Sequence, residues 1–312
     1  MITISRRECL AAMAGAAVAT ASPRERPTIC MFSKFFQWTN VQEMSGLCAA
    51  MGYEGIDLTV RPGGHVLPER VEDDLPKAVE TIRQAGLRVP MVTAGIVDAS
   101  SPHAESVLKT LSTLGIRRYR WGGFQYTDKA SIPDQLAEFG VRVKDLAAMN
   151  KHYGECAMYH THSGVNLVGA SMWDLYLLLK DCDADAVSVN FDIGHATVEG
   201  GYGGWIHSSR LLMPYVRGVA VKDFKWVCNE SGAWEPGWCA LGQGMVNLKQ
   251  FLPMLKAAGF SGPLQLHFEY PELGGPNEGK ATFSIPKERL LAIFRRDLAV
   301  LKAQLRQAEL AS

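Results

Sequence analysis

The sequence lacks an excess of charge of either sign, and it lacks any long apolar span. Its 32 Lys and Arg residues balance 32 Asp and Glu residues, so the formal net charge at pH 7 is zero. A neutral chain has no electrostatic footprint for nucleic acid or for an anionic membrane, so we expect neither as a partner. No stretch approaches the ~20 consecutive apolar residues of a membrane-spanning helix. With 47% hydrophobic and 21% charged residues, the composition is typical of a soluble globular protein.

Paired cysteines are also missing. None of the seven cysteines belongs to a CxxC motif, which argues against a zinc finger or a thiol redox site. Cys228 and Cys239 lie in one long predicted loop, where they could join as a disulfide after export. Four others are more simply interpreted as buried free thiols, namely Cys30, Cys48, Cys156 and Cys182.

The first 26 residues differ in character from the rest of the chain. Arg6 and Arg7 precede an Ala-rich apolar run and a small-x-small cleavage site that ends at Ala21. This order is typical of an export signal and resembles the twin-arginine type, which carries proteins already folded. We therefore assign residues 1–26 to an export signal and residues 27–312 to the folded domain, which we expect to work in the periplasm without membrane contact after cleavage. An ordinary amphipathic N-terminal helix on a cytoplasmic protein is the alternative.

The rest of the chain alternates strand-like and helix-like segments eight times. The strand-like segments are 28–33, 55–60, 88–93, 116–121, 156–160, the run that opens at Val187, 219–223 and 264–269. Gly86 and Gly259 each follow a predicted helix, as a left-handed cap requires. Eight such units in ~285 residues predict a single-domain α/β fold, the (β/α)8 TIM barrel. A doubly wound open sheet is disfavoured, because no Gly-rich phosphate loop follows the first strand.

Polar side chains gather where these strands end, and in a (β/α)8 barrel that edge carries the active groups. They are Asp57, Arg120, His160, His162, Asp192, His195, Lys222, Asp223, His267 and Glu269. Four of the eight histidines fall in this set. That concentration favours a functional site at Asp192 and His195 over an Asp that merely caps a helix beside a satisfied His.

The spacing of these groups indicates a metal site or a polar network. His160 and His162 face the same side of an extended strand, and so do His267 and Glu269. His160, Asp192 and Glu269 can form a mixed nitrogen and oxygen site for one divalent ion such as Mn²⁺, Co²⁺, Mg²⁺ or Zn²⁺. Such an ion would acidify a C–H beside a polarised carbonyl, and a carboxylate or His could move the proton. A hydrogen-bonded network without metal is the alternative.

Lysine and aromatic side chains supply the remaining candidates. Lys222 and Asp223 are adjacent, so they point to opposite faces; Lys222 could hold a sugar oxygen or an enolate, or form a plain salt bridge. Aromatic rings could stack on a sugar or pack under the loops, and the candidates are Trp121, Trp226 and Phe36. The long segment 224–244 is expected to fold over the barrel mouth.

Five segments together resemble the xylose-isomerase-like superfamily of sugar phosphate isomerases and epimerases: YHTHSG (159–164), FDIGHA (191–196), VKDF (221–224), LGQG (241–244) and LHFEY (266–270). The resemblance implies a (β/α)8 barrel that acts on ketoses, inososes or related polyols with one divalent metal. It matches Asp192 and Glu269 to two metal ligands and His195 to a substrate contact. Two positions depart from the pattern: His160 stands where Glu is frequent, and Ala220 where the strand-seven ligand is usually His.

These observations predict a sugar isomerase or epimerase that works through a metal-stabilised enediolate. The catalytic candidates are Glu269, His160 and Lys222. The candidates for binding a sugar or polyol are His195, His162, His267, Arg120, Asp57 and Trp226, and a homo-oligomer is compatible with this reading. A lyase or dehydratase that acts on a keto-sugar, keto-glycoside or inosose is a second reading. A carbohydrate-binding barrel that has lost catalysis, as Ala220 suggests, is a third.

Overall fold

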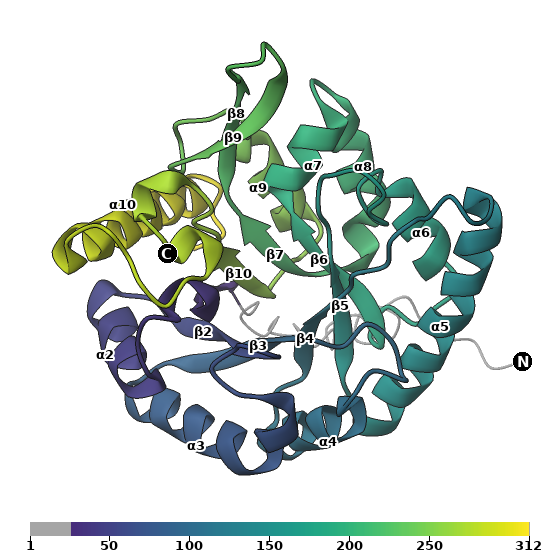
Figure 1. The fold of residues 1–312 in the computed structure, drawn as a ribbon, viewed down its shortest axis with the longest axis horizontal. Helices are drawn as coiled ribbons and strands as arrows, with labels where there is room; N and C mark the ends of the chain where they lie inside the picture. Colours follow the sequence, from purple (N-terminus) through teal and green to yellow (C-terminus); the bar gives the residue numbers. More distant parts are fainter. Residues whose placement is uncertain (1–25, 312) are drawn as a thin grey trace, which may run out of the picture.

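Eight parallel strands close into a barrel in the computed structural model, which describes residues 26–311 (Figure 1). Around the barrel their order is β1 (Thr28–Phe32), β2 (Gly55–Val60), β3 (Arg88–Ala94), β4 (Arg118–Trp121), β5 (Cys156–His160), β6 (Val187–Asp192), β7 (Val216–Val221) and β10 (Pro263–Leu266). Each strand lies beside its neighbour in sequence, apart from an inserted hairpin, and β10 closes the barrel against β1. The predicted single-domain (β/α)8 fold is confirmed.

Helices surround the barrel and connect its strands (Figure 1). They are α2 (Val41–Met51), α3 (Val71–Gln84), α4 (Ala104–Leu114), α5 (Ile132–Tyr153), α6 (Trp173–Leu179), α7 (Ile193–Gly200), α8 (Gly204–Leu212), α9 (Leu248–Ala257) and α10 (Lys287–Gln307). Short 3-10 turns cover Ser33–Phe36, Pro68–Arg70, Met213–Tyr215, Pro271–Leu273 and Pro276–Glu278. Gly86 and Gly259 have φ angles of 79° and 69°, which confirms the two predicted left-handed caps.

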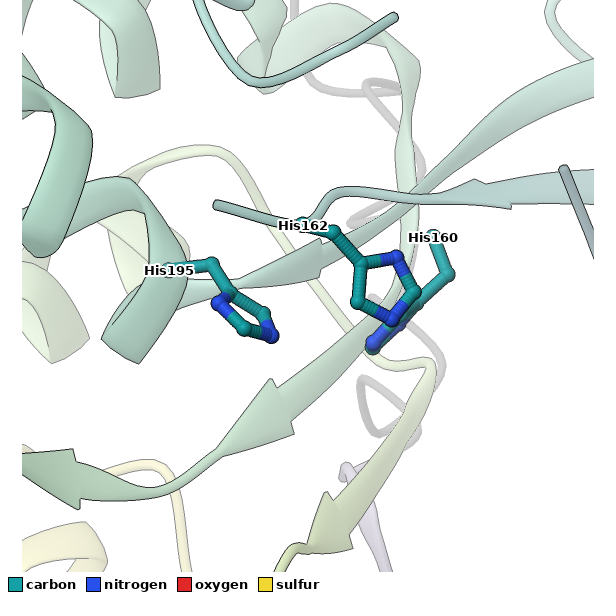
Figure 2. A group of neighbouring side chains, drawn as sticks. All are labelled: His160, His162 and His195. Atoms are coloured by element: carbon teal, nitrogen blue, oxygen red, sulfur yellow. The ribbon is translucent and has the colours of Figure 1, made fainter. Parts of the chain in front are cut away.

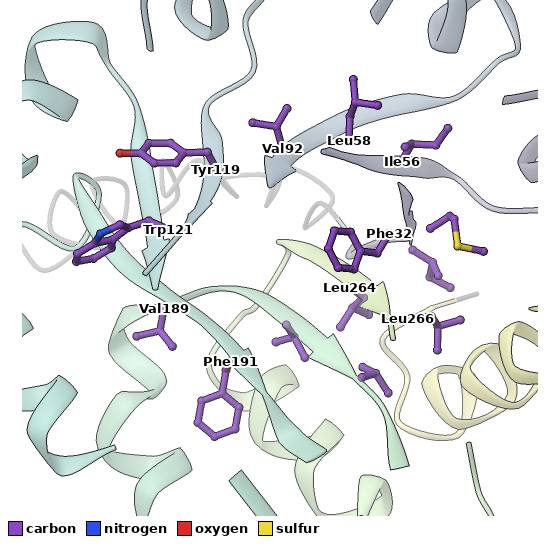
Figure 3. Packing of buried hydrophobic residues seen from close by; sticks show 14 of the residues in the cluster. Phe32, Ile56, Leu58, Val92, Tyr119, Trp121, Val189, Phe191, Leu264 and Leu266 are labelled. Atoms are coloured by element: carbon purple, nitrogen blue, oxygen red, sulfur yellow. The ribbon is translucent and has the colours of Figure 1, made fainter. Parts of the chain in front are cut away.

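Side chains alternate between the two faces of each strand, and this alternation separates the core from the site. One set is apolar, fully buried and belongs to the main hydrophobic cluster, as Figure 3 shows for Ile56, Leu58, Val189, Phe191, Leu264 and Leu266. The alternate set fills the barrel and includes polar groups: Asn190 Nδ2 donates to Gln265 Oε1 at 2.8 Å. Gly218 leaves room there, because a Cβ at this position would lie 2.9 Å from Met158 Sδ. The polar residues at the strand ends therefore continue the set that fills the barrel.

The segment after β7 is an antiparallel hairpin of β8 (Asp223–Cys228) and β9 (Trp234–Cys239), which projects beyond the ring of helices in Figure 1. Its register pairs Cys228 with Trp234 and Asp223 with Cys239, so the two cysteines lie at opposite ends. Five residues of strand span about 17 Å, far beyond the reach of a disulfide. The predicted Cys228–Cys239 disulfide is therefore wrong, and both thiols are free.

Asp223 fixes the base of this hairpin. Its carboxylate accepts backbone N–H groups from Phe224, Gly242, Gly244 and Val246 at 2.9–3.0 Å. Lys222 points the other way, into the barrel, as the strand alternation predicts. The two neighbours thus divide their tasks between holding the loop and building the site.

The predicted export signal lies outside the described residues, except for Arg26. Within residues 26–311, no helix is both long and apolar enough to cross a bilayer. The N-terminal expectation therefore stays a prediction.

Candidate active site

The candidate site lies at the C-terminal ends of β5, β6, β7 and β10. His160, Asp192, Lys222 and His267 converge there, and each is at most 3% exposed. Asp192 serves two purposes. Its Oδ1 accepts the backbone N–H of His195 at 3.0 Å and caps α7, while its Oδ2 has no hydrogen-bond partner. The capping and functional interpretations of this residue are therefore compatible, because each uses a different oxygen.

Four imidazole rings surround this point. The ring centroids of His160 and His162 are 4.4 Å apart, those of His162 and His195 are 5.0 Å apart, and those of His160 and His267 are 5.3 Å apart. Figure 2 shows His160, His162 and His195. Burial lowers the pKa of His162 to about 3, and nearby cations, Arg120 foremost, add to the effect. Burial also holds the pKa of the other three well below the ordinary range. All four rings are therefore neutral at pH 7 and keep a nitrogen lone pair.

At this site, five buried side-chain atoms lack a hydrogen-bond partner among the described residues. They are both ring nitrogens of His160, both ring nitrogens of His267, and Oδ2 of Asp192. His160 Nε2 and His267 Nδ1 each lie 3.7 Å from that oxygen. One donor atom from each residue lies within 4.8 Å of the others. Burying a polar atom without a partner is costly, and a shared divalent ion would take Oδ2 of Asp192 and one ring nitrogen of each histidine as ligands. Oδ2 also faces Lys222 Nζ, at 3.4 Å. The donor set therefore fits the implied metal.

Glu269 lies at the edge of this cluster and faces two lysines. Its Oε2 is 2.5 Å from Lys222 Nζ, its Oε1 is 3.5 Å from Lys34 Nζ, and its side chain is 23% exposed. Burial raises the pKa of Glu269, but the ammonium groups of Lys222 and Lys34 outweigh this and hold the pKa well below the usual range. The carboxylate is ionised and open to the barrel mouth. Of the predicted metal ligands, the structure brings His160 and Asp192 together and turns Glu269 toward the lysines.

Lys222 also fixes the proton on His195. Its Nζ lies 2.6 Å from His195 Nε2, and His195 Nδ1 lies 2.7 Å from Ser163 Oγ. An ammonium only donates hydrogen bonds, so Nε2 accepts and Nδ1 carries the hydrogen that it donates to Ser163. The Ser163 hydroxyl hydrogen then remains available to a ligand. Ser163 was missed as a site residue, although it lies inside the YHTHSG segment.

Arg120 reaches the cluster, whereas Asp57 does not. Arg120 Nη2 lies 3.2 Å from His162 Nε2, and burial lowers the pKa of Arg120 only to about 10, so it remains a cation. Asp57 is fully buried; both of its oxygens lie 2.9 Å from Thr93 Oγ1, which donates to them. Burial raises the pKa of Asp57 to about 7. Asp57 supports Arg120 electrostatically from inside the barrel and does not face the mouth.

One aromatic neighbour of the site is Trp238, which lies in the segment expected to fold over the barrel mouth but was not among the individual aromatic candidates. Its ring centroid lies 5.0 Å from that of His195 and 4.0 Å from Lys222 Nζ. Trp226 instead lines a cavity of about 570 Å³ with Tyr202 and Met245. The hairpin register explains the difference: it pairs Trp238 with Phe224 at the hairpin base.

The other two aromatic candidates belong to the core. Trp121 is 1% exposed, donates to Val97 O at 2.6 Å and packs on Tyr159. Phe36 is fully buried between Trp38 and Phe294. Both rings therefore support the barrel and have no free face for a sugar.

The model of the xylose isomerase-like TIM barrel family matches residues 46–290. The chain belongs to this family. No curated protein matches its sequence. Among solved structures of the same fold, a D-psicose 3-epimerase with D-tagatose from Clostridium cellulolyticum H10 has a TM-score of 0.66 at 13% identity, over 89% of this chain and 99% of that chain.

Two further solved structures of the same fold are similar to this chain. A barrel protein from Mycobacterium smegmatis in complex with magnesium has a TM-score of 0.63 at 16% identity, over 89% of this chain and 97% of that chain. A probable 3-DHS dehydratase from Bacillus anthracis has a TM-score of 0.63 at 14% identity, over 88% and 98%. At these identities, the likeness establishes the shared fold.

Proposed function

We propose that this chain is a sugar isomerase or epimerase that moves a proton beside the carbonyl of a ketose or related polyol through an enediolate. The Lys222–Glu269 pair carries the proposal. An ionised carboxylate that is 23% exposed lies at the edge of a cluster of buried neutral histidines. Sugar epimerases among the structural neighbours support the same class of substrate.

Glu269 acts as the base. Its low pKa makes it a weak base, so the substrate C–H has to be made more acidic before transfer. A divalent ion held by His160 and Asp192 would supply that acidity by polarising the carbonyl. When Glu269 takes up the proton it loses its charge, and the ammonium groups of Lys222 and Lys34 then face the negative enediolate. Fixed positive charges at that point stabilise the reaction's charged state.

The remaining groups bind and orient the substrate. The Ser163 hydroxyl, the Arg120 guanidinium and the His162 ring offer hydrogen bonds to sugar hydroxyls. Trp238 offers an apolar ring face beside His195. This combination of one aromatic face with a few convergent polar groups is typical of small-ligand sites.

A β-eliminating lyase or dehydratase is a second candidate, favoured by His160. Reprotonation from the opposite face of an enediolate needs a second acid, and a carboxylic acid at the end of β5 could fill that role. His160 occupies this position instead, and its pKa is too low for it to carry a proton at pH 7. Elimination needs only one base to start, and Glu269 can provide it. The neighbouring probable dehydratase supports this reading.

The test is solvent exchange. Ketoses, inososes and keto-glycosides are incubated with the protein in D₂O and followed by ¹H NMR. Loss of a C–H signal with formation of an isomer supports the isomerase or epimerase, and formation of an unsaturated product supports the lyase. Sugar binding without any exchange would overturn both in favour of a non-catalytic barrel.

A further inference from the structure

We infer that the metal ion at this site is held by His160, Asp192 and His267, and that this set selects a borderline transition metal, such as Zn²⁺ or Co²⁺, over Mg²⁺. The inference takes the location of the site from the proposed function. It names the ligands and the class of metal, both of which can be measured without turnover.

Geometry selects the third ligand. His267 Nδ1 lies 3.7 Å from Asp192 Oδ2, the same distance as His160 Nε2, and neither ring has a hydrogen-bond partner in the described chain. Ligand atoms that share one ion at ~2.1 Å lie ~3.0–3.5 Å apart, so an inward movement of these three atoms, which lie within 4.8 Å of one another, completes the set. Strand β7 contributes none, because the residue paired with Asp192 is Ala220.

Glu269 is held away from the ion by charge. Its two oxygens already face the ammonium groups of Lys222 and Lys34. Moving it onto the ion would leave Lys222, whose side chain is 1% exposed, with Asp192 at 3.4 Å as its one anionic partner among residues 26–311. Separating a buried cation from its partner is expensive. Glu269 therefore stays with the lysines.

His267 and Asp192 are held in place by their surroundings. The Phe32 ring stacks on His267 with centroids 5.0 Å apart and an interplanar angle of 26°. Thr161 Oγ1 accepts the backbone N–H of Asp192 at 2.9 Å, and Oδ1 of Asp192 is fixed by α7. Such supporting contacts orient metal ligands before the ion arrives.

The donor chemistry then decides the metal. Two neutral imidazoles and one carboxylate suit Zn²⁺, Co²⁺ or Ni²⁺, whereas Mg²⁺ prefers oxygen ligands and keeps its waters. The nearby cations Arg120 and Lys222 repel every divalent ion alike, so they lower the affinity for each metal without changing which metal binds most tightly. The preference therefore follows from the two nitrogen donors.

The test is calorimetric titration of the full-length, chelator-stripped protein with Zn²⁺, Co²⁺ and Mg²⁺. A Cys228→Ser background removes the exposed thiol, which would also take zinc. We expect one site that binds Zn²⁺ or Co²⁺ at least ~100-fold more tightly than Mg²⁺. The visible spectrum of bound Co²⁺ should report nitrogen ligation.

Variants decide the ligand set. His267→Ala and His160→Ala should each weaken Co²⁺ binding at least ~10-fold and alter the visible spectrum. Glu269→Gln should leave the Co²⁺ affinity and the spectrum unchanged. His267→Gln replaces His267→Ala if the latter does not fold. Equal affinity for Mg²⁺, absence of any binding, or loss of metal in Glu269→Gln but not at His267 would overturn the inference. None of these results depends on C–H exchange, so the proposed function stands or falls separately.

Discussion

The Nζ atom of Lys222 lies 2.5 Å from Oε2 of Glu269, and this contact joins the end of β7 to the residues that follow β10. It places an ammonium between the carboxylate at the mouth and the buried Asp192, 3.4 Å away. The same ammonium fixes the tautomer of His195. Lys222 thus keeps Glu269 ionised, fixes the hydrogen-bonding of His195, and lies between the carboxylates of Glu269 and Asp192.

Replacing Lys222 by Met should therefore lower both activity and stability. Two carboxylates would lose their closest cation, and we expect the free energy of unfolding of metal-free protein to fall by about 2–4 kcal/mol. Urea unfolding measures this. Lys34→Met is the matched control, because the Lys34 side chain is 21% exposed and its Nζ lies 3.5 Å from Glu269 Oε1. This change should lower the free energy of unfolding by less than about 1 kcal/mol. An equal effect of the two changes would contradict the central position of Lys222.

Trp238 should contribute to substrate binding. Trp238→Leu removes the ring face beside His195 and Lys222, and we expect KM to rise about 5–10-fold, in line with ~1 kcal/mol for an aromatic contact. Trp234→Leu, on the same strand but 69% exposed, should leave KM unchanged. Steady-state kinetics with the substrate found by NMR measure both, and a similar response of the two variants would remove Trp238 from the site.

Glu155 should make the protein less stable as the pH rises. Its side chain is fully buried, its oxygens have no hydrogen-bond partner, and burial raises its pKa from the ordinary 4.5 to about 8. The folded state therefore holds a proton that the unfolded chain releases, so stability is lost as the pH rises from 4.5 through 8. Glu155→Gln should match wild type at pH 4.5 and exceed it by up to about 4 kcal/mol at pH 9.

Thermal unfolding at the two pH values measures this difference. Glu230→Gln, on the exposed hairpin turn, is the control and should change nothing at either pH. A Gln variant of Glu155 that is less stable than wild type at pH 9 would show that the buried carboxylate is ionised and paired.

Export remains a prediction from Arg6 and Arg7. Changing both to Lys should retain the protein in the cytoplasm, because the twin-arginine pathway reads the pair itself. Fractionation of cells that express each form measures this. Continued export of the double variant would show that another signal operates.

The barrel and most of the site could be predicted from the sequence because both depend on short periods. Alternation along a strand places His160, Asp192 and His267 in the barrel once the strand ends are known. The second partner of Glu269, Lys34, could not be predicted, because it lies 235 residues away in the sequence. The choice of Trp238 over Trp226, and the separation of Cys228 from Cys239, depend on the register of one hairpin. The Asp223 contacts to Gly242 and Gly244 fix the base of that hairpin, and only the folded chain shows them.

The most direct test of the proposed reaction is C–H exchange in D₂O by Glu269→Gln, measured together with its metal content. Gln keeps the shape of Glu269 but cannot take up the proton. We expect a folded protein with full metal content whose exchange rate is lower by ~10²–10⁴-fold. Near-wild-type exchange by a folded, metal-loaded Glu269→Gln protein would contradict the proposal that Glu269 is the base.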